Sequence, residues 1–445
     1  MNVLPKSDAR QAAARVAARL RAAGHEAFFA GGCVRDALRR RRPKDYDVAT
    51  SARPSEVERL FKRTVGVGKA FGVMRVREGG VETEVATFRV DGPYRDGRRP
   101  SAVRFCGAEE DAKRRDFTVN GLFYDPARRR VADYVGGRSD LARRVLRAIG
   151  DPRARFQEDH LRMLRAVRFA AELGFRIEAA TWRAVRAMAP RIRRVSSERI
   201  RDELTKLLVS PRPGHGIKLL AKSGLLRRIL PEVDRMRGVP QPRAFHPEGD
   251  VFVHTTVALD QLPKKPSAAL AWATLLHDVG KPPTFERSPR RGRRIRFPGH
   301  AGVGAKMADR ILRRLRFSNA EREAIAEIVG NHMTFKDVPR MRLATIKRLL
   351  ARSTFEDELA MHRADCLASH GSVSNVRILR GWQRKLKREE IRPPRLVTGA
   401  DLIALGWKPG PIFGRILAEI EDAQLAGEIA TREQALAFAA RPRDE

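Results

Sequence analysis

Apolar residues recur along the chain with two different periods, and the change between them predicts its architecture. Before about residue 150, short runs such as residues 44–49 and 81–90 alternate between apolar and polar side chains, which is typical of half-buried strands. Beyond Asp151-Pro152, apolar side chains recur every three to four residues, as in helices that pack on one side. The pattern predicts an α+β fold in which a small sheet-containing head precedes an extended helical remainder.

The segment from residue 28 to residue 50 carries the strongest chemical signal. A short strand is expected before Gly31-Gly32 and a helix after it, so a phosphate group could approach the glycine backbone at a helix N-terminus. On the alternating run that follows, Asp45 and Asp47 project from one face. Neighbouring carboxylates repel each other unless a cation lies between them, and Mg²⁺ bound to nucleotide phosphates fits such a pair. Each feature alone is more often a solvated turn, but together they favour metal-dependent phosphoryl or nucleotidyl transfer.

The charge of the chain indicates a polyanionic partner. It carries 90 Lys and Arg against 53 Asp and Glu, a formal net charge of +37. No run approaches 18 apolar residues, so we expect nucleic acid and not a membrane. A genome rich in G and C also raises the arginine content, so the charge supports an RNA partner without proving it.

Cysteine usage and the first residues bear on the compartment. Cys33, Cys106 and Cys366 are far apart in the sequence, which argues against a disulfide framework and against a cysteine zinc site. The first 24 residues show a helical stripe of Ala, Val and Leu but no apolar core of a signal peptide. We therefore expect a cytoplasmic protein.

The motif GG-x-V-R-D followed by D-x-D-V-A-T resembles the class II nucleotidyltransferases, the bacterial family of tRNA CCA-adding enzymes and poly(A) polymerases. The resemblance implies that Asp45 and Asp47 hold Mg²⁺ and that Gly32 and Arg35 bind nucleotide. Glu84 lies on the second alternating run, where a metal-site role and a solvated strand face are equally compatible with its spacing. Its place in the family's E-V-x-T-F motif favours a third catalytic carboxylate.

Two further motifs of the head continue this resemblance. The run RRDFTVNG, which we expect on a helix with Asn120 one turn later, implies that Arg115 contacts triphosphate and Asp116 ribose. The segment from Asp91 to Phe105 is rich in Gly, Pro and Arg and matches the family's flexible loop.

A single helix is expected over residues 154–175, with Asp159 and Arg162 as neighbours on one face. They could form an exposed salt bridge that contributes a few tenths of a kcal/mol, that is about 0.3. Alternatively, their acceptors and donors could read the edge of a base. The run resembles the family's EDxxR motif, which implies that this pair selects C or A. By the same resemblance, Arg165 and Arg168 would reach triphosphate or RNA phosphate.

Histidines concentrate between residues 246 and 370, where seven of the ten occur. The patterns FVHT, LLHDVGK, PGHAGVG, GNHM and HRADCLASHG resemble the HD phosphohydrolase domain. The resemblance implies a divalent metal, Ni²⁺, Mn²⁺ or Mg²⁺, at one set of ligands and a second metal at two additional histidines. The first set is His254, His277, Asp278 and Asp365, and the additional pair is His300 and His332. A degenerate domain kept only for structure is the alternative.

The resemblance covers nearly the whole chain and implies four parts: a mixed-sheet nucleotidyltransferase head (1–150), an all-helical neck and body (151–245), an HD domain (246–372) and a tRNA-binding tail (373–445). The expected activity is template-independent addition of CMP and AMP from CTP and ATP to the 3′ end of tRNA. Three alternatives stay open: an A-adding enzyme or poly(A) polymerase of the same family, an HD phosphohydrolase with a non-catalytic head, and a non-catalytic RNA-binding protein.

Overall fold

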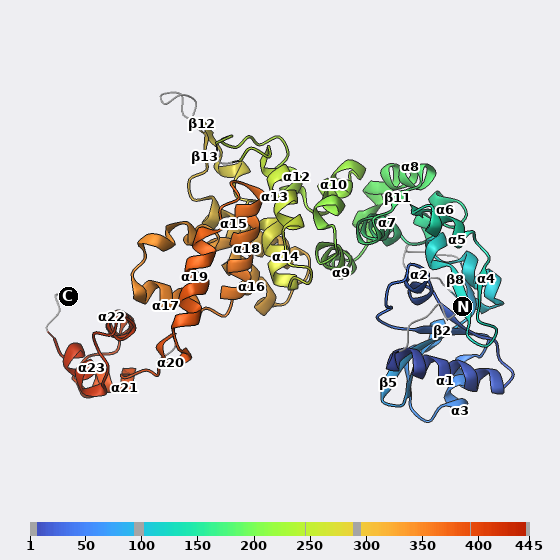
Figure 1. Ribbon diagram of the computed structural model, residues 1–445, viewed down its shortest axis with the longest axis horizontal. Helices are drawn as coiled ribbons and strands as arrows, with labels where there is room; N and C mark the ends of the chain where they lie inside the picture. The colour runs from blue at the N-terminus through green and yellow to red at the C-terminus, as the bar shows by residue number, and fades with distance from the viewer. Residues whose placement is uncertain (1–6, 93–101, 245, 288–294, 392, 442–445) are drawn as a thin grey trace. The chain divides into compact units, whose positions relative to one another are not determined.

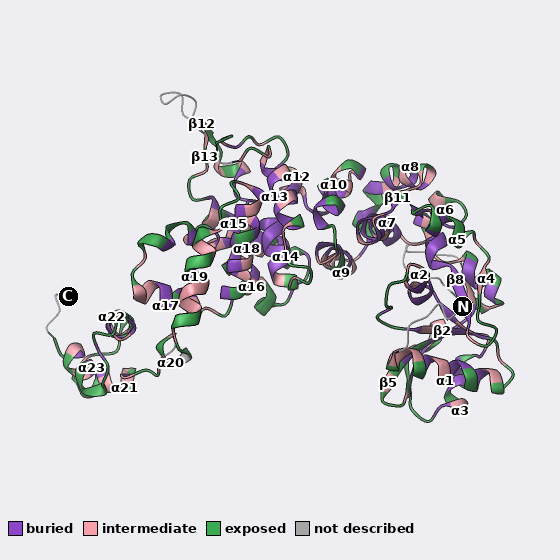
Figure 2. Ribbon diagram, viewed as in Figure 1, coloured by how far each residue is buried: buried purple, intermediate pink, exposed green. Residues whose placement is uncertain are grey.

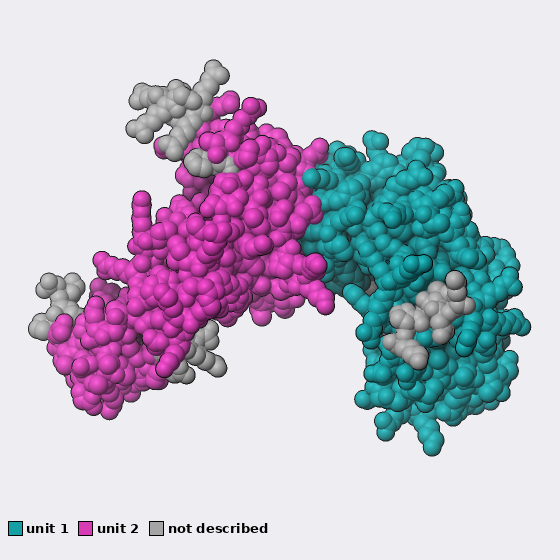
Figure 3. Space-filling view, in the orientation of Figure 1, with its two compact units in different colours: residues 1–234 teal, residues 235–445 magenta. Residues whose placement is uncertain are grey.

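The computed structural model describes residues 7–92, 102–244, 246–287, 295–391 and 393–441. It divides into two compact units, residues 1–234 and residues 235–445 (Figure 3). The first unit holds the large sheet, and the second is almost wholly helical, so the α+β prediction is confirmed. The finer boundaries expected near residues 150, 245 and 372 stay predictions.

Seven strands of the first unit form one mixed sheet, of which Figure 1 labels β2, β5 and β8. Their order is β3-β4-β5-β2-β1-β8-β9. The strands are β1 (Ala27–Ala30), β2 (Asp47–Thr50), β3 (Thr64–Gly68), β4 (Val73–Glu78), β5 (Val81–Thr87), β8 (Leu122–Asp125) and β9 (Arg130–Asp133). β2 and β5 run parallel, and the other neighbours run antiparallel. β2, which begins at Asp47, is therefore the central strand of the sheet.

The two faces of this sheet have different helical cover. Helix α1 (Asp8–Ala22) packs against β1, β2, β4 and β5 through a buried stripe of Ala, Val and Leu. On the other face, Ala49 belongs to an apolar cluster that includes Ala108 and Ala112 of α4 (Ala108–Lys113). Since side chains alternate along a strand, Asp47 lies on the same face as Ala49, the face that α4 covers.

Helices make up the rest of the first unit. Those near the sheet are α2 (Gly32–Leu38), α3 (Pro54–Leu60) and α5 (Gly137–Ala142). Those that follow are α6 (Pro152–Glu158), α7 (Leu161–Leu173), α8 (Ala179–Met188), α9 (Ser197–Leu208), α10 (Pro213–Ser223), α11 (Leu226–Ile229) and α12 (Pro231–Asp234). The short strands β10 (Val145–Leu146) and β11 (Arg176–Ile177) pair in parallel. Helix α7 is buried on almost every side and forms the core of this helical part (Figure 2).

The prediction of one continuous helix over residues 154–175 is wrong at Asp159. Helix α6 ends at Glu158, and Asp159 adopts an extended conformation, with φ of −142° and ψ of 106°. The Asp159 carboxylate accepts a hydrogen bond from the backbone N–H of Leu161 over 3.0 Å. Short polar side chains compete with the helix for backbone groups in this way, so α6 ends before Asp159 and α7 begins two residues after it.

The helix expected to carry Arg115 and Asp116 is also shorter than predicted. Helix α4 ends at Lys113, and the backbone N–H of Phe117 donates to the Asp116 carboxylate over 2.8 Å. This local bond turns the chain before a short 3₁₀ helix at Thr118–Asn120. Upstream, β6 (Arg89–Asp91) pairs with β7 (Val103–Phe105) and holds the two ends of the expected flexible loop, whose residues 93–101 lie outside the described part of the chain.

The second unit is a helical array with one small hairpin. Its first helices are α13 (Val251–Asp260), α14 (Ala268–Leu276), α15 (His300–Arg314), α16 (Asn319–Asn331), α17 (Leu343–Ala351) and α18 (Phe355–Ala368). The remaining helices are α19 (Ser374–Lys385), α20 (Arg388–Ile391), α21 (Gly399–Ala404), α22 (Pro411–Ala426) and α23 (Arg432–Ala439), and the hairpin is β12 (Glu286–Arg287) with β13 (Ile295–Arg296). Among the described residues, no helix has the length and apolar character needed to cross a membrane.

Candidate active site and metal centre

A glycine turn joins β1 to α2, as the sequence predicted. Gly31 has a φ of +71°, a conformation that favours glycine, and its N–H donates to the carbonyl of Leu122 over 3.0 Å. A Cβ atom at Gly31 would lie 3.1 Å from Nη1 of Arg115. The absence of a side chain therefore lets Arg115 reach the turn, so the two features expected to contact phosphate lie together.

Three carboxylates gather at the start of β2. The parallel register of Val48 with Val85 places Glu84 next to Asp47, and Asp45 precedes the strand by two residues. Asp45 and Glu84 are exposed, whereas Asp47 is half-buried. Burial, followed by repulsion from Glu84 and Asp45, raises the pKa of Asp47 to about 7. The fold thus concentrates more negative charge here than its surroundings neutralise.

This excess negative charge fits a divalent cation. Carboxylate oxygens are the protein ligands that Mg²⁺ prefers, usually one or two of them together with substrate phosphates. Among the described residues of the head, no three possible ligand atoms lie within 4.8 Å of one another.

Asp116 lies at the centre of a buried polar network. Its carboxylate accepts hydrogen bonds from Arg165 over 2.9 and 2.6 Å and from the Asn120 amide over 3.1 Å. Burial opposes ionisation, but the Arg165 guanidinium and the Asn120 amide outweigh it and lower the pKa of Asp116 to about 2. Arg35 extends the network, since its Nη1 donates to Asn120 Oδ1 over 2.7 Å. Asp116 and Arg35 are thus held by the protein itself, and their contacts with nucleotide stay predictions.

Asp159 and Arg162 have partners that the sequence did not indicate. Asp159 accepts two hydrogen bonds from Arg199 of α9, over 3.1 and 2.7 Å. Arg162 donates to the Glu158 carboxylate over 2.5 Å and to the carbonyl of Arg114 over 3.2 Å. The described contacts include no ion pair between Asp159 and Arg162. The exposed salt bridge between Asp159 and Arg162, which was the simpler interpretation, is therefore absent from the described contacts. Each side chain instead has its own ion-pair partner.

Arg165 and Arg168 both contact one carboxylate on α9, that of Glu203. Glu203 lies 3.6 Å from Arg165 Nη1 and accepts a hydrogen bond from Arg168 Nε over 2.6 Å. The guanidinium carbon of Arg168 also lies 3.8 Å from the centre of the Phe169 ring, and that of Arg165 lies 5.2 Å from it. Arg168 is buried, so its expected contact with phosphate stays a prediction, whereas Arg165 keeps about 30% of its side chain exposed.

Sequence reasoning missed Arg199 and Glu203, although both lie on a helix that it predicted. Their only signal is the charge of SSERIRDELTKLL, in which Arg199 and Glu203 are four residues apart and share a face. Glu203 is 3% exposed, which is rare for a carboxylate without a charged partner. The apolar face of the helix therefore contains one charge that the helical pattern alone does not explain.

The second unit brings the six predicted HD residues together. His254 Nε2 lies 2.9 Å from Asp365 Oδ1 and 3.9 Å from Asp278 Oδ2. His277 Nε2 lies 3.3 Å from the same oxygen of Asp278. His300 and His332 approach the other oxygen of Asp278 to 3.8 and 3.9 Å. Asp278, 1% exposed, is thus the common centre of the cluster.

Backbone carbonyls orient three of these imidazoles. Nδ1 of His277, His300 and His332 lies 2.8, 2.9 and 2.7 Å from the carbonyls of Thr274, Phe297 and Val329 respectively. A carbonyl only accepts, so each Nδ1 carries the proton and each Nε2 presents a lone pair. Nε2 of His300 and Nε2 of His332 lie 3.1 Å apart. Two lone pairs that face each other at this distance fit a shared cation.

Three buried atoms of this cluster, His254 Nε2, His277 Nε2 and Asp278 Oδ2, have no described partner with hydrogen-bond geometry, although Asp365 and Lys281 lie within ion-pair distance of two of them. Buried polar atoms are rarely left in this state, so the donor set fits a metal ion. Sequence reasoning missed Glu248, which accepts from His254 Nδ1 over 2.6 Å, and Lys281, whose Nζ lies 2.7 Å from Asp278 Oδ2. Glu248 follows no recognisable spacing, but Lys281 stands in the HDVGK run.

Comparisons with known proteins match both regions of the chain that contain these residues. The model of the poly A polymerase head domain matches residues 27–147, that of a probable RNA and SrmB-binding site of polymerase A matches residues 174–237, and that of the HD domain matches residues 254–369. The A-adding tRNA nucleotidyltransferase of Deinococcus radiodurans is 37% identical over 94% of this chain and 96% of its own length. The chain belongs to the tRNA nucleotidyltransferase and poly(A) polymerase family. This confirms the resemblance seen in the sequence, and with it the enzyme class.

Other members of the tRNA nucleotidyltransferase family support the assignment along the whole chain. The CCA-adding enzyme of Streptococcus mutans is 32% identical over 96% of this chain and 95% of its own length. Among solved structures, the CCA-adding enzyme of Bacillus stearothermophilus in complex with CTP is 28% identical, covers 98% of this chain and 97% of its own, and has a TM-score of 0.75. The similarity therefore extends through the helical and HD regions.

Proposed function

We propose that this protein transfers nucleotides from CTP and ATP to the 3′ end of tRNA. The observation that carries the proposal is the cluster of Asp45, Asp47 and Glu84 beside the Gly31 turn and Arg115, within a chain that matches tRNA nucleotidyltransferases along its full length. A group of carboxylates next to an arginine at a glycine turn suits a metal-bound nucleoside triphosphate.

In this proposal, the residues of the first unit have separate roles. Asp45 and Asp47, with Glu84 beside them, would hold divalent ions, which when bound stabilise the attacking and leaving oxygens of an in-line displacement. Arg115 would orient the triphosphate, since its guanidinium stands at the turn and is braced by Asp111 at 3.2 and 3.0 Å. Asp159 and Arg162 would select the base.

Nucleotide choice depends on donors and acceptors that the protein leaves free. Arg162 uses Nη1 and one hydrogen of Nη2 for protein contacts, and no described residue accepts from its Nε. Asp159 Oδ2 accepts one hydrogen bond, from Arg199. One guanidinium edge and one carboxylate lone pair therefore remain for the Watson–Crick edge of a base.

The experiment that tests this function is the incubation of the purified protein with three tRNAs, ending before CCA, after C and after CC, with each nucleoside triphosphate alone. Addition of C to the first two and of A to the third would establish CCA addition. Addition of A only to the third would establish the A-adding activity that the name of the Deinococcus relative carries. Addition to none of them contradicts the proposal.

A second activity is proposed for the HD cluster, a metal-dependent phosphohydrolase. It rests on the convergence of imidazole nitrogens and carboxylate oxygens around the buried Asp278. Since four of the six predicted ligands are imidazoles, Ni²⁺ or Mn²⁺ suits the cluster better than Mg²⁺. Hydrolysis of a nucleoside 2′,3′-cyclic phosphate that needs added Ni²⁺ or Mn²⁺ and disappears in His277→Ala would support this activity, and metal-independent hydrolysis would contradict it.

A further inference from the structure

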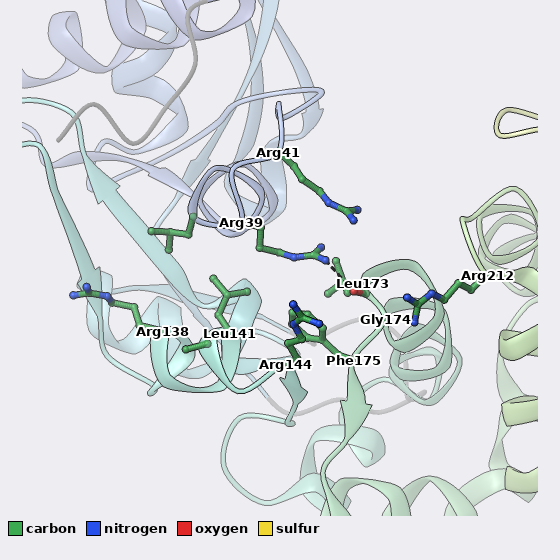
Figure 4. A pocket seen from close by; sticks show the side chains of 11 residues that line it. Arg39, Arg41, Arg138, Leu141, Arg144, Leu173, Gly174, Phe175 and Arg212 are labelled. Carbon is green, nitrogen blue, oxygen red and sulfur yellow. Dashed lines mark hydrogen bonds between the residues drawn. The ribbon is translucent and has the colours of Figure 1, made fainter.

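A cavity of about 510 Å³ in the first unit is lined by five arginines, and none of the described lining residues is acidic (Figure 4). Arg39 and Arg41 come from the end of α2, Arg144 follows α5, and Arg212 precedes α10. Figure 4 shows the guanidinium groups of Arg39, Arg144 and Arg212 turned toward the end of α7, whereas that of Arg138 turns away.

This arginine cavity is separate from the candidate active site. The Gly31 turn lies at the N-terminal end of α2, and the cavity lies at its C-terminal end. In the same way, Asp159 stands before α7, whereas Gly174 of the cavity follows that helix. A helix of 13 residues, such as α7, is about 20 Å long. The cavity therefore lies at the ends of α2 and α7 opposite to those that carry the Gly31 turn and Asp159.

Among the described residues, no carboxylate forms an ion pair with the arginines that line the cavity. Arg41, Arg144 and Arg212 are exposed and have no carboxylate partner among the described residues. Arg39 is half-buried; its Nη2 donates to the carbonyl of Leu173 over 2.9 Å, but its Nη1 is buried without a hydrogen-bond partner. Burial and then repulsion from Arg41 lower the pKa of Arg39, against the attraction of Asp36. An anion in the cavity would satisfy the free nitrogen and relieve this repulsion.

Two backbone features keep the arginines in place. Arg144 has a φ of +54°, a left-handed conformation that residues other than glycine rarely adopt. At Gly174, which also has a positive φ, an added Cβ atom would lie 2.8 Å from Nη1 of Arg212. Arg144 thus adopts a conformation that favours glycine. At Gly174, a side chain would displace Arg212. Strain of this kind often accompanies a binding function.

We propose that the arginine cavity binds a phosphate group of the RNA substrate, outside the nucleotide site. The guanidinium fork matches phosphate oxygens in two parallel hydrogen bonds. Arg41, Arg144 and Arg212 are open to a macromolecule, and a chain of net charge +37 attracts RNA as a whole. A free phosphate or pyrophosphate would present the same chemistry. The choice of RNA rests on the proposed transfer to tRNA.

The test compares a cavity variant with a matched control. Arg41→Gln/Arg212→Gln removes two cavity guanidinium groups, and Arg183→Gln/Arg186→Gln removes two exposed arginines of α8 outside the cavity. Both variants lose the same charge. Binding of a tRNA that lacks its 3′ CCA is measured without nucleotide, between about 50 and 200 mM salt. We expect the cavity variant to bind about tenfold more weakly than the control, with a plot of log affinity against log salt flatter by about 1.5.

A second arm identifies the source of the phosphate. If inorganic pyrophosphate raises the melting temperature of the wild type but not of the cavity variant, while tRNA binding is equal in both variants, the cavity binds a free anion. The proposal is overturned if the cavity variant and the control bind tRNA equally and if pyrophosphate shifts the melting temperature of the wild type and of the cavity variant by the same amount. Because the assays use no nucleotide, failure of the transfer activity leaves their result unaffected.

Arg144→Gly separates binding from folding. Glycine relieves the positive φ at this position, so the melting temperature should rise while tRNA binding weakens. A purely structural role of Arg144 predicts a lower melting temperature and unchanged tRNA binding, and that result counts against the proposal.

Discussion

Arg199→Ala is expected to relax nucleotide selection without touching the carboxylates of the head. Arg199 donates two hydrogen bonds to Asp159, of 3.1 and 2.7 Å. Asp159 lies after the end of α6, outside any helix. Without this fork, Asp159 keeps only the N–H of Leu161 as a described partner, at 3.0 Å. Its second oxygen then rotates freely, so it no longer meets a base in a fixed direction.

The structure allows the expected changes in stability and in nucleotide preference to be estimated. The side chains of Arg199 and Asp159 are 25% and 15% exposed, so solvent screens their attraction, and we expect a loss of about 1 kcal/mol in the free energy of unfolding. Selection depends on unpaired polar groups instead, each of which costs roughly 1–3 kcal/mol in a closed site. The preference for CTP and ATP over GTP and UTP should therefore fall by about ten- to two-hundredfold.

The assay measures kcat/KM for each of the four nucleoside triphosphates separately, on one tRNA acceptor. Arg194→Ala is the matched control, since it removes an exposed arginine five positions earlier that has no described partner. Asp159→Ala should relax the preference to a similar degree, and the double variant with Arg199→Ala should be no worse than either single one. An unchanged preference ratio in Arg199→Ala, with the expected loss of stability, would remove Asp159 from nucleotide selection.

Three further variants test the remaining assignments. Asp47→Asn should lower nucleotide addition by about a thousandfold or more and preserve tRNA affinity, as measured by extension and by binding, because it removes a metal ligand and no RNA contact; near wild-type turnover would refute the metal role. The pKa of Asp116 is about 2, against an ordinary value of 3.8. Above about pH 4 its ionised form therefore contributes about 2 kcal/mol to the free energy of unfolding, and this contribution is lost as the pH falls toward 2. Asp116→Asn should abolish this acid-sensitive part of the free energy of unfolding, and an unchanged pH profile would show the network to be weaker than its geometry implies. His277→Ala should weaken Mn²⁺ or Ni²⁺ binding at least about a hundredfold by calorimetry and leave nucleotide addition intact; undiminished binding would place the metal elsewhere.

The sequence predicted those parts of the head that depend on short-range pattern. Gly31 reverses the chain, and Asp47 begins a strand, because both properties follow from the residue and its immediate neighbours. The gathering of the HD residues was predicted through the resemblance, since His254 and Asp365 are 111 positions apart and no local pattern joins them. The α+β division followed from the change of hydrophobic period.

The partners of Asp159 and Arg162 could not be predicted in the same way. Asp159 and Arg162 were expected on one helix, but the choice between continuing a helix and capping the next one rests on a single hydrogen bond to Leu161. Arg199 lies 40 positions away, on α9, and the packing of α9 against α7 brings it to Asp159. Glu248 was missed for a similar reason, because its loop has no period and only the fold brings it to His254.

The separate ion-pair partners of Asp159 and Arg162 have a consequence for replacing these two residues. Each side chain pairs with an oppositely charged group, Asp159 with Arg199 and Arg162 with Glu158. A substitution at either side chain leaves its partner charged and poorly solvated, which lowers the free energy of unfolding. If the pair selects the base, replacing a side chain together with its charged partner should therefore change the preference at a smaller cost in stability than replacing the side chain alone.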